Sequence, residues 1–230
     1  MRTLGLIGGM SWESSAHYYR LINQGVRARK GGAHSAPLLM LSVDFKEIAA
    51  LQHAGDWPTL GKRMAAAART LVDAGAEAIV LCTNTMHQVA DAIEAAQPQP
   101  LLHIADATGA AIAEAGHRRV GLLGTAFTME QPFYRARLTE RFGLEVLTPG
   151  IEERAEVHRI IYEELVRGIV SDNSRARYTA IIAGLVANGA TAVILGCTEI
   201  MLLIAQSDSP VPLFDTTALH ATMAVDFAIG

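Results

Sequence analysis

The stretch LVDAGAEAIVL, residues 71–81, recurs later in the chain as LVANGATAVIL, residues 185–195. Leucine, valine, glycine and alanine repeat in register, and the two copies begin 114 residues apart, at 71 and 185. In each copy a glycine suited to the left-handed end of a helix precedes an apolar run of strand length. The stretch therefore predicts, twice, a helix that leads into a buried strand, which is a building unit of parallel α/β folds.

Further matches in the same order extend the repeat along the chain. RTLGLIG at 2–8 resembles RRVGLLG at 118–124, and PLL at 100–102 resembles PLF at 212–214. A single Gly-Ala before an apolar run would mean little, because many helices end in this way, but several matches in one order indicate a duplication. We therefore predict two similar halves related by a pseudo-two-fold axis. Ligands bind at the carboxyl ends of parallel strands, so matching loops should face a shared cleft.

Apolar runs of strand length alternate with amphipathic stretches of helix length, which predicts an α/β fold. We expect two pseudo-symmetric parallel-sheet domains of the Rossmann-like, flavodoxin-like type, with the active site in the inter-domain cleft. The first domain is expected at 1–100 with 210–230, and the second at 101–209. Strands are expected at 2–7, 38–42, 78–81, 101–104, 120–123, 144–147, 192–195 and 211–214. The clearest helices are expected at 14–29, 58–74, 131–142, 155–166 and 175–187.

Composition argues against several classes of protein. The chain of 230 residues is 50% hydrophobic and 18% charged, and its formal charge of −4 would on average repel a polyanion such as nucleic acid. Charge or glycine breaks every apolar run before the ~18 residues of a membrane span. Two cysteines form no disulfide framework, and the N-terminus lacks the pattern of a signal peptide. We expect a cytoplasmic protein that binds neither nucleic acid nor membrane.

Both cysteines lie in two loops that the repeat places opposite each other. These loops are CTNTMH at 82–87 and GCTEIM at 196–201, and each follows an expected strand and opens an expected helix. Unpaired N–H groups at a helix N-terminus favour an anion, so a thiol there can have a lowered pKa and act as a nucleophile or base. Cys197, flanked by Gly196 and Thr198, is the stronger candidate for this chemistry.

Cofactor and metal motifs have little support. Gly5, Gly8 and Gly9 do not give the GxGxxG spacing of a dinucleotide site. The eight histidines are scattered, with no pair at helical metal-ligand spacing and no paired cysteines at zinc spacing. We therefore expect neither a cofactor nor a metal.

Three motifs resemble those of the cofactor-independent aspartate/glutamate racemases. They are GLIGGMS at 5–11, TNTMH at 83–87 and GCTE at 196–199, and the resemblance runs through essentially the whole chain. The resemblance implies two pseudo-symmetric α/β domains, a homodimer, and racemisation of acidic amino acids without pyridoxal phosphate. It also implies one cysteine in each half, so that a thiolate removes the Cα proton while a thiol protonates the opposite face.

The chain departs from this family in the first half, where Thr83 occupies the position of the usual cysteine. Cys82 lies one residue earlier, and adjacent side chains of a strand point to opposite faces, so it is not a simple replacement. The repeat independently pairs Thr83 with Cys197. A threonine hydroxyl can offer a proton but is a poor base. We therefore expect Cys197 to be the base and Thr83, backed by water or His87, the donor on the opposite face, and the resemblance implies a preference for L-aspartate or L-glutamate.

Candidate substrate contacts come from the strand-end loops and from the resemblance. Donors at 8–11 and 83–85 are expected to stabilise the substrate carboxylate, because no cofactor accepts the charge. Glu199 is expected either to orient the substrate ammonium or to be simply a negative charge at a helix N-terminus, where the helix dipole stabilises it. Relatives often have arginine at Gln52 and lysine at Val166, which leaves broader specificity open. The full set of expected contacts is Met10, Gln52, Asn84, Thr85, Thr125, Thr198 and Glu199.

Three other kinds of function stay open at this point, the first being an enzyme that uses a single cysteine. A single-cysteine decarboxylase or a maleate-type isomerase needs only one proton donor, and Thr83 is compatible with either. A racemase of broad specificity is compatible with the departures at Gln52 and Val166. A non-catalytic amino-acid-binding protein is the third, because two lobes around a cleft are also the layout of ligand sensors.

Overall fold

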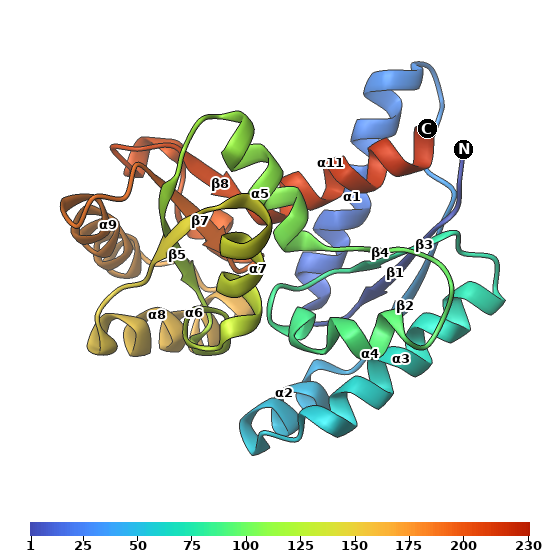
Figure 1. Ribbon diagram of the computed structural model, residues 1–230, viewed down its shortest axis with the longest axis horizontal. Coiled ribbons are helices and arrows are strands. Elements are labelled where there is room, and N and C mark those ends of the chain that lie inside the picture. The colour runs from blue at the N-terminus through green and yellow to red at the C-terminus, as the bar shows by residue number, and fades with distance from the viewer. The chain divides into compact units, whose positions relative to one another are not determined.

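Eight parallel strands form two four-stranded sheets in the computed structural model, which describes residues 1–230 (Figure 1). The first sheet has the order β2 (Leu38–Ser42), β1 (Leu4–Gly8), β3 (Ala78–Leu81) and β4 (Leu101–Leu102). The second has the order β6 (Glu145–Leu147), β5 (Arg119–Gly124), β7 (Ala192–Gly196) and β8 (Leu213–Asp215). The two orders correspond strand for strand and are flavodoxin-like, as the duplication predicted.

Strand register carries the repeat down to single residues. In the first sheet Ile7 of β1 lies opposite Leu81 of β3, and in the second their counterparts, Leu123 of β5 and Leu195 of β7, lie opposite each other. Parallel pairing brings the carboxyl ends of the neighbouring strands to one edge of each sheet. The loops 82–87 and 196–201 therefore leave equivalent edges of their own sheets.

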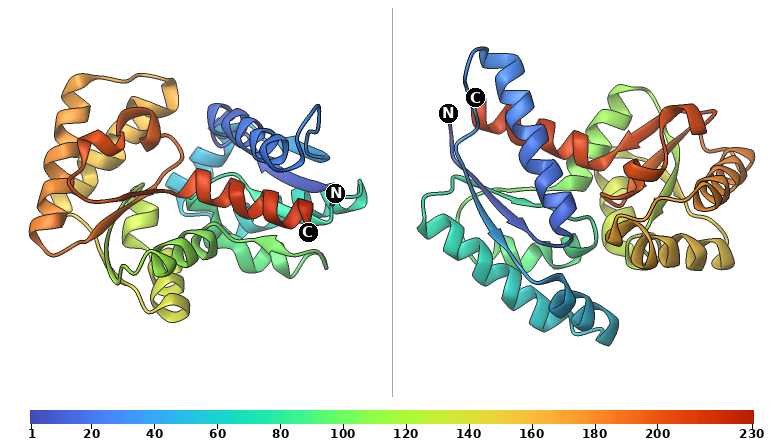
Figure 2. Two further views of the ribbon diagram at one scale, coloured as in Figure 1. Left: turned by 90° about the horizontal axis from the view of Figure 1, so that it is seen from above. Right: turned by 180° about the vertical axis from the view of Figure 1, so that it is seen from behind.

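Helices cover both faces of the first sheet because its residues alternate between two apolar clusters. Helices α1 (Trp12–Lys30) and α11 (Thr216–Ile229) pack on the face that includes Leu6 and Val80. Figure 2 shows α11 in red beside α1 in blue, where Arg29 and Asp226 form an ion pair. The other face packs against α2 (Phe45–Ala54), α3 (Trp57–Asp73) and α4 (Ala90–Glu94).

The loop after β1 depends on a glycine. Gly9 has a φ of +90°, and a Cβ at this position would lie 2.2 Å from the backbone oxygen of Val43. Any side chain would therefore clash with the end of β2 as well as strain the backbone. The helix that follows begins with Ser11 as its N-cap, and its side chain accepts a hydrogen bond from the Ser14 N–H.

Helices of the second half follow the same plan. They are α5 (Ile104–Glu114), α6 (Ala126–Glu130), α7 (Pro132–Phe142), α8 (Ile151–Glu163), α9 (Asp172–Ala187) and α10 (Ile200–Leu203). Short 3₁₀ helices occur in both halves: η1 (Thr85–Val89) in the first, and η2 (Leu165–Arg167) and η3 (Gln206–Asp208) in the second. Leu185 of α9 packs over Gly121 of β5, and Phe142 of α7 packs over Gly109 of α5. The absence of side chains at these glycines lets the elements approach closely.

The chain divides into one unit of Met1–Ile104 with His220–Gly230 and a second of Ala105–Leu219. The expected division differs at two places. It assigned 101–104 to the second domain, although β4 in this segment pairs with β3 in the first sheet, and it assigned 210–219 to the first domain. These residues include β8, which pairs with β7 in the second sheet. Helix α11 then carries the chain back into the first unit, so the change of unit falls inside this helix at Leu219.

The expected helices differ from the observed ones by a few residues, and the largest difference lies after β6. The sequence pattern predicted a helix at 155–166, whereas α8 spans Ile151–Glu163 and is followed by η2. Gly150 is the N-cap, and its N–H donates to the side chain of Glu153 at 3.1 Å. No helix combines the length and the apolar character that crossing a membrane requires.

Candidate functional site

The first candidate loop leaves β3 and carries Thr83, Asn84 and Thr85. The N–H of Cys82 donates to the carbonyl oxygen of Ile7 at 2.9 Å, which ties this end of β3 to β1. The side chains of Thr83, Asn84 and Thr85 are all buried, and η1 begins at Thr85. Three of the expected site residues therefore lie together at the carboxyl edge of the first sheet.

Cys82 belongs to the core of the first unit. Its side chain is fully buried in the cluster on the α1 and α11 face, together with Ala78 and Val80. The Sγ donates to the carbonyl oxygen of Val80 at 3.8 Å, and burial raises the pKa of the thiol. Strand alternation explains this placement, because residues 78, 80 and 82 share one face. The thiol is therefore protonated and packed as a small apolar group.

Gln52 and Met10 are brought close to the same loop. Gln52 lies on α2, and its Nε2 donates to the Sδ of Met86 in η1 at 3.2 Å. Met10 and Met86 belong to one apolar cluster. Both expected substrate contacts therefore lie near η1, and both are buried.

The loop after β1 satisfies one of its expected donors internally. The N–H of Gly9 donates to the Oγ of Ser15 at 2.7 Å, and the Oγ of Ser15 donates to the carbonyl oxygen of Ser11 at 2.9 Å. The Gly9 N–H is thus not available to a substrate carboxylate, contrary to the expectation for 8–11. Within this loop, Met10 stays the candidate for a substrate contact.

Thr125 and Cys197 leave the second sheet on neighbouring strands. They follow Gly124 and Gly196, which lie opposite each other in the register. A Cβ on Gly124 would lie 2.8 Å from the backbone oxygen of Gly196, so side chains are excluded where the loops begin. Thr125 is the N-cap of α6, and its Oγ1 accepts a hydrogen bond from the Thr128 N–H at 3.3 Å. Its expected contact with a substrate carboxylate stays a prediction.

Cys197, Thr198 and Glu199 form one hydrogen-bonded group. The thiol of Cys197 donates to Oε2 of Glu199 at 3.0 Å, and the hydroxyl of Thr198 donates to the same oxygen at 2.8 Å. Thr198 and Glu199 are buried, while Cys197 is half-buried. The carboxylate of Glu199 is therefore directed at the thiol of Cys197.

The electrostatics of this group correct one expectation from the sequence. Burial is the main cause that raises the pKa of Cys197 well above its usual value, and the negative charge and hydrogen bond of Glu199 raise it further. The N–H groups of Glu199 and Thr198 favour the thiolate, as expected for a helix N-terminus, but their effect is smaller. Cys197 is therefore a thiol at rest, not the thiolate that its position in the sequence indicated.

Replacing Glu199 with glutamine should lower the pKa of Cys197, because the carboxylate charge is removed while the backbone N–H groups remain. At pH 8 the thiolate fraction should rise, and alkylation of Cys197 by iodoacetamide should become at least several-fold faster. The pH profile of alkylation measures the pKa directly.

Two variants control this experiment. Glu163→Gln makes the same change on the exposed surface of α8 and should leave the alkylation profile unchanged. Cys197→Ser keeps only the buried Cys82 and should abolish alkylation of the native protein. An alkylation midpoint that stays the same or rises in Glu199→Gln would show that the carboxylate does not hold the thiol protonated.

Helix α8 supplies residues that the sequence did not single out. Nδ1 of His158 accepts a hydrogen bond from the Ala126 N–H at 3.1 Å, and the ring of Tyr162 lies 4.6 Å from that of His158, centroid to centroid. Burial and then the charges of Cys197 and Glu199 raise the pKa of Tyr162. Because residues four apart share a helix face, a row at 158 and 162 was visible in the sequence, but nothing there indicated what it faces.

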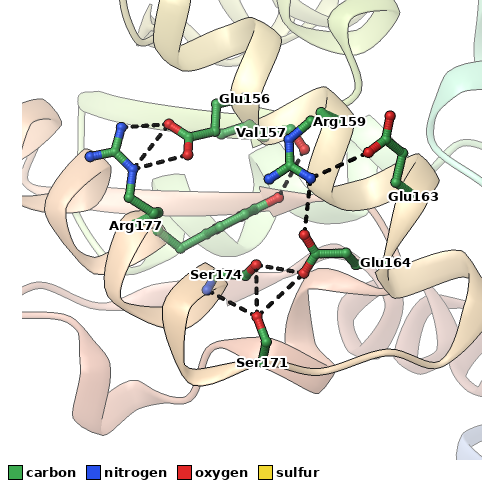
Figure 3. A network of polar contacts seen from close by, with 9 residues as sticks. Glu156, Val157, Arg159, Glu163, Glu164, Ser171, Ser174 and Arg177 are labelled. Carbon is green, nitrogen blue, oxygen red and sulfur yellow. Dashed lines mark hydrogen bonds and ion pairs between the residues drawn. The ribbon is translucent and has the colours of Figure 1, made fainter.

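A polar network holds the turn after α8 (Figure 3). Glu164 accepts hydrogen bonds from Arg159 at 3.1 Å and from the hydroxyl of Ser174 at 2.5 Å, and the Ser174 hydroxyl bond is the main cause that lowers its pKa. A separate pair joins Arg177 to Glu156 at 2.5 Å. The network links α8 to α9 and so fixes η2, which contacts α10. Val166, where relatives often have lysine, lies in this turn.

The expected site residues thus fall into two groups. Met10, Gln52, Thr83, Asn84 and Thr85 belong to the first unit, and Thr125, Cys197, Thr198 and Glu199 to the second. No three histidine, cysteine, aspartate or glutamate side chains gather in a way that could hold a metal ion. The reactive groups among these residues are the thiol of Cys197, with the Glu199 carboxylate as acceptor, and the hydroxyl of Thr83.

Two matched α/β units, each with a polar loop after its third strand, fit the two-domain plan that the resemblance to the aspartate/glutamate racemases implies. The sequence profile described as Asp/Glu/Hydantoin racemase matches residues 7–224. The chain belongs to this family, and it is an isomerase of the racemase type.

Solved structures agree with this assignment. A Yersinia pestis protein with the provisional name Asp/Glu racemase is 57% identical, with a TM-score of 0.93 and 100% of both chains covered. An aspartate racemase homologue from Pyrococcus horikoshii OT3 is 36% identical, with a TM-score of 0.84 and 100% of both chains covered. The aspartate racemase of Picrophilus torridus shares the fold at 17% identity and a TM-score of 0.75, over 98% of this chain and 95% of that one.

Proposed function

We propose that the protein racemises aspartate and glutamate without pyridoxal phosphate, with Cys197 as the base for the L enantiomer and Thr83 as the proton donor on the opposite face. The observation that carries the proposal is the hydrogen bond of 3.0 Å from the Cys197 thiol to Glu199. It gives this thiol a proton acceptor, whereas Cys82 is packed in the core. The acidic substrates named for the relatives support the substrate class.

The proton transfers balance in four steps. Cys197 passes its thiol proton to Glu199, and the resulting thiolate removes the Cα proton of the L substrate. Thr83 then gives its hydroxyl proton to the other face of the planar carbanion, which inverts the carbon. Glu199 releases its proton to solvent, and solvent returns one to Thr83. The net change is inversion alone, with no electron acceptor and no group transferred.

Substrate binding completes the proposal. Asn84, Thr85 and Met10 are proposed to hold the carboxylate on Cα, and Thr125 and Thr198 to contact the substrate from the second unit. Donors placed around this carboxylate stabilise the charge that develops when the Cα proton leaves. Gln52, a neutral amide, would hold a distal carboxylate less firmly than arginine. Together with Val166, this favours some activity on other amino acids.

Because Thr83 and Cys197 differ in basicity, the proposed preference for L should be visible in kcat and KM. Two enantiomers have equal free energies, so kcat/KM must be equal in the two directions. The preference therefore has to take the form of a higher kcat together with a higher KM for the L enantiomer. The homodimer, the cytoplasmic location and independence of any cofactor stay predictions from the sequence.

Chiral chromatography of each enantiomer of aspartate and glutamate, incubated with the protein in heavy water, tests the function. D product that carries deuterium at Cα should appear from the L substrates, with the larger kcat in that direction. Equal kcat and KM for both enantiomers would remove the L preference. Release of carbon dioxide from a malonate, without any D product, would show a decarboxylase. Binding without exchange at Cα would show an amino-acid-binding protein.

A further inference from the structure

The imidazole of His87 bridges two backbone groups in the first unit. Its Nδ1 lies 2.8 Å from the carbonyl oxygen of Thr83, and its Nε2 accepts a hydrogen bond from the N–H of Ile104 at 3.3 Å. Because the Ile104 N–H donates, Nε2 carries no proton, and the proton of the neutral ring sits on Nδ1. Nδ1 therefore donates to Thr83. His87 is only 2% exposed, so water does not compete for these bonds.

Two other histidine rings lie next to the ring of His87. The rings of His103 and His220 lie 4.4 Å and 5.9 Å from that of His87, centroid to centroid. Nε2 of His220 donates to the carbonyl oxygen of Leu102 at 2.6 Å, and its Nδ1 accepts from the hydroxyl of Tyr18 at 2.9 Å. Burial lowers the pKa of His220 to about 4, so this ring is neutral at physiological pH.

These bonds tie the Thr83 loop to the segment that ends the first unit. Ile104 is the last residue of this unit before the chain leaves it, and His220 is the first residue after the chain returns. His87 thus binds a residue at the first point where the chain changes unit, and His220, at the second point, binds Leu102 close to the first. The loop after β3 is bound to this end of the first unit by a contact that spans 17 residues of sequence.

We propose that His87 is a positioning residue for Thr83, acting through the Thr83 carbonyl and not as a proton relay. Each ring nitrogen is engaged by a backbone group, so the ring is oriented away from proton exchange with substrate. Fixing the Thr83 peptide fixes the position of its Cα–Cβ bond, from which the hydroxyl extends, and a misplacement of about 1 Å at a reacting group can cost about 10²-fold in rate. The inference rests on the proposed role of Thr83 as donor.

A pair of reactions separates the two halves of the mechanism. Racemisation of L-glutamate needs both the base and the donor. Elimination from 3-chloro-L-glutamate needs only the base. In the elimination, Cys197 takes the Cα proton, the C–H electrons form a Cα–Cβ double bond, and chloride leaves Cβ; the enamine then hydrolyses to the 2-oxo acid and ammonia. A residue that positions only Thr83 should affect the first reaction and spare the second.

The test compares His87→Leu and His87→Gln with the unchanged protein in both reactions. His87→Leu should lower kcat for racemisation by about 10- to 100-fold with KM nearly constant, while chloride release stays within about twofold. His87→Gln should recover much of the loss, because glutamine offers one donor and one acceptor. His220→Gln is the matched control from the same buried cluster. It should lower the melting temperature and leave the ratio of the two activities unchanged.

Three results would overturn the inference. A parallel fall of both reactions in His87→Leu would show a purely structural role, and failure of His87→Gln to recover activity would exclude the bridging hydrogen bonds. The variant Thr83→Ala identifies the third case. If Thr83→Ala loses racemisation and His87→Leu does not, only the role of His87 is wrong. If Thr83→Ala racemises normally, the proposed function of Thr83 fails as well.

Discussion

Replacing Cys197 with alanine should lower kcat for racemisation of L-glutamate by about 10³-fold or more, which corresponds to about 4 kcal/mol in the activation free energy. The reason is that Cys197 carries the only thiol in the loop 196–201, and Glu199 accepts its hydrogen bond at 3.0 Å. Chloride release from 3-chloro-L-glutamate should fall by a similar factor, because it uses the same base. Chiral chromatography and a chloride assay measure the two rates.

The second cysteine supplies a matched control for this prediction. Cys82→Ala also removes a thiol, but from the core. The hydrogen bond of this thiol goes to the carbonyl oxygen of Val80, which is not an expected site residue. The kcat should stay within about twofold, while the free energy of unfolding falls by about 1 kcal/mol because a small cavity forms. Equal losses of activity in the two variants would contradict the assignment of Cys197 as base.

Replacing Thr83 with cysteine should raise kcat for D-glutamate by about tenfold or more. A thiol is several pKa units more acidic than a hydroxyl, so its thiolate is accessible as a base near neutral pH, which a threonine alkoxide is not. The gain should be larger at pH 9 than at pH 7. Initial rates with each enantiomer at both pH values measure it.

Two further substitutions at this position define the control. Thr83→Ser keeps the hydroxyl and should keep most of the activity toward L-glutamate. Thr83→Ala removes it and should lower racemisation by about 10²-fold while sparing elimination. A Thr83→Cys protein with an unchanged kcat for D-glutamate would mean that the weak basicity of threonine does not limit the reaction in that direction.

The repeat predicted two similar halves, and the two sheets indeed have the same number and order of strands, because duplicated segments fold alike. The match between 100–102 and 212–214 indicates that each half ends in an equivalent strand. The strand in the second half is β8, which pairs with β7. The expected domain boundary at 210 did not follow that match and was placed before β8. Strand alternation likewise gave the orientation of Cys82, since a buried strand has a period of two residues.

Contacts between residues far apart in the sequence could not be predicted from the repeat or from strand alternation. The bond from Ile104 to His87 and that from Ala126 to His158 join loops to helices, and no periodicity encodes which backbone group faces a given imidazole. The pKa of Cys197 was predicted with the wrong sign. The helix N-terminus was visible in the sequence, but the larger effects are burial and the direction of the Glu199 side chain, which only the folded chain sets.

The protonated state of both thiols also bears on how the protein withstands oxidants. Peroxide reacts with thiolates, and burial raises the pKa of Cys82 and of Cys197. Neither cysteine therefore presents an easily oxidised sulfur at neutral pH. In the proposed mechanism the thiolate of Cys197 arises when Glu199 takes its proton, so the sulfur should be open to oxidative damage mainly during turnover.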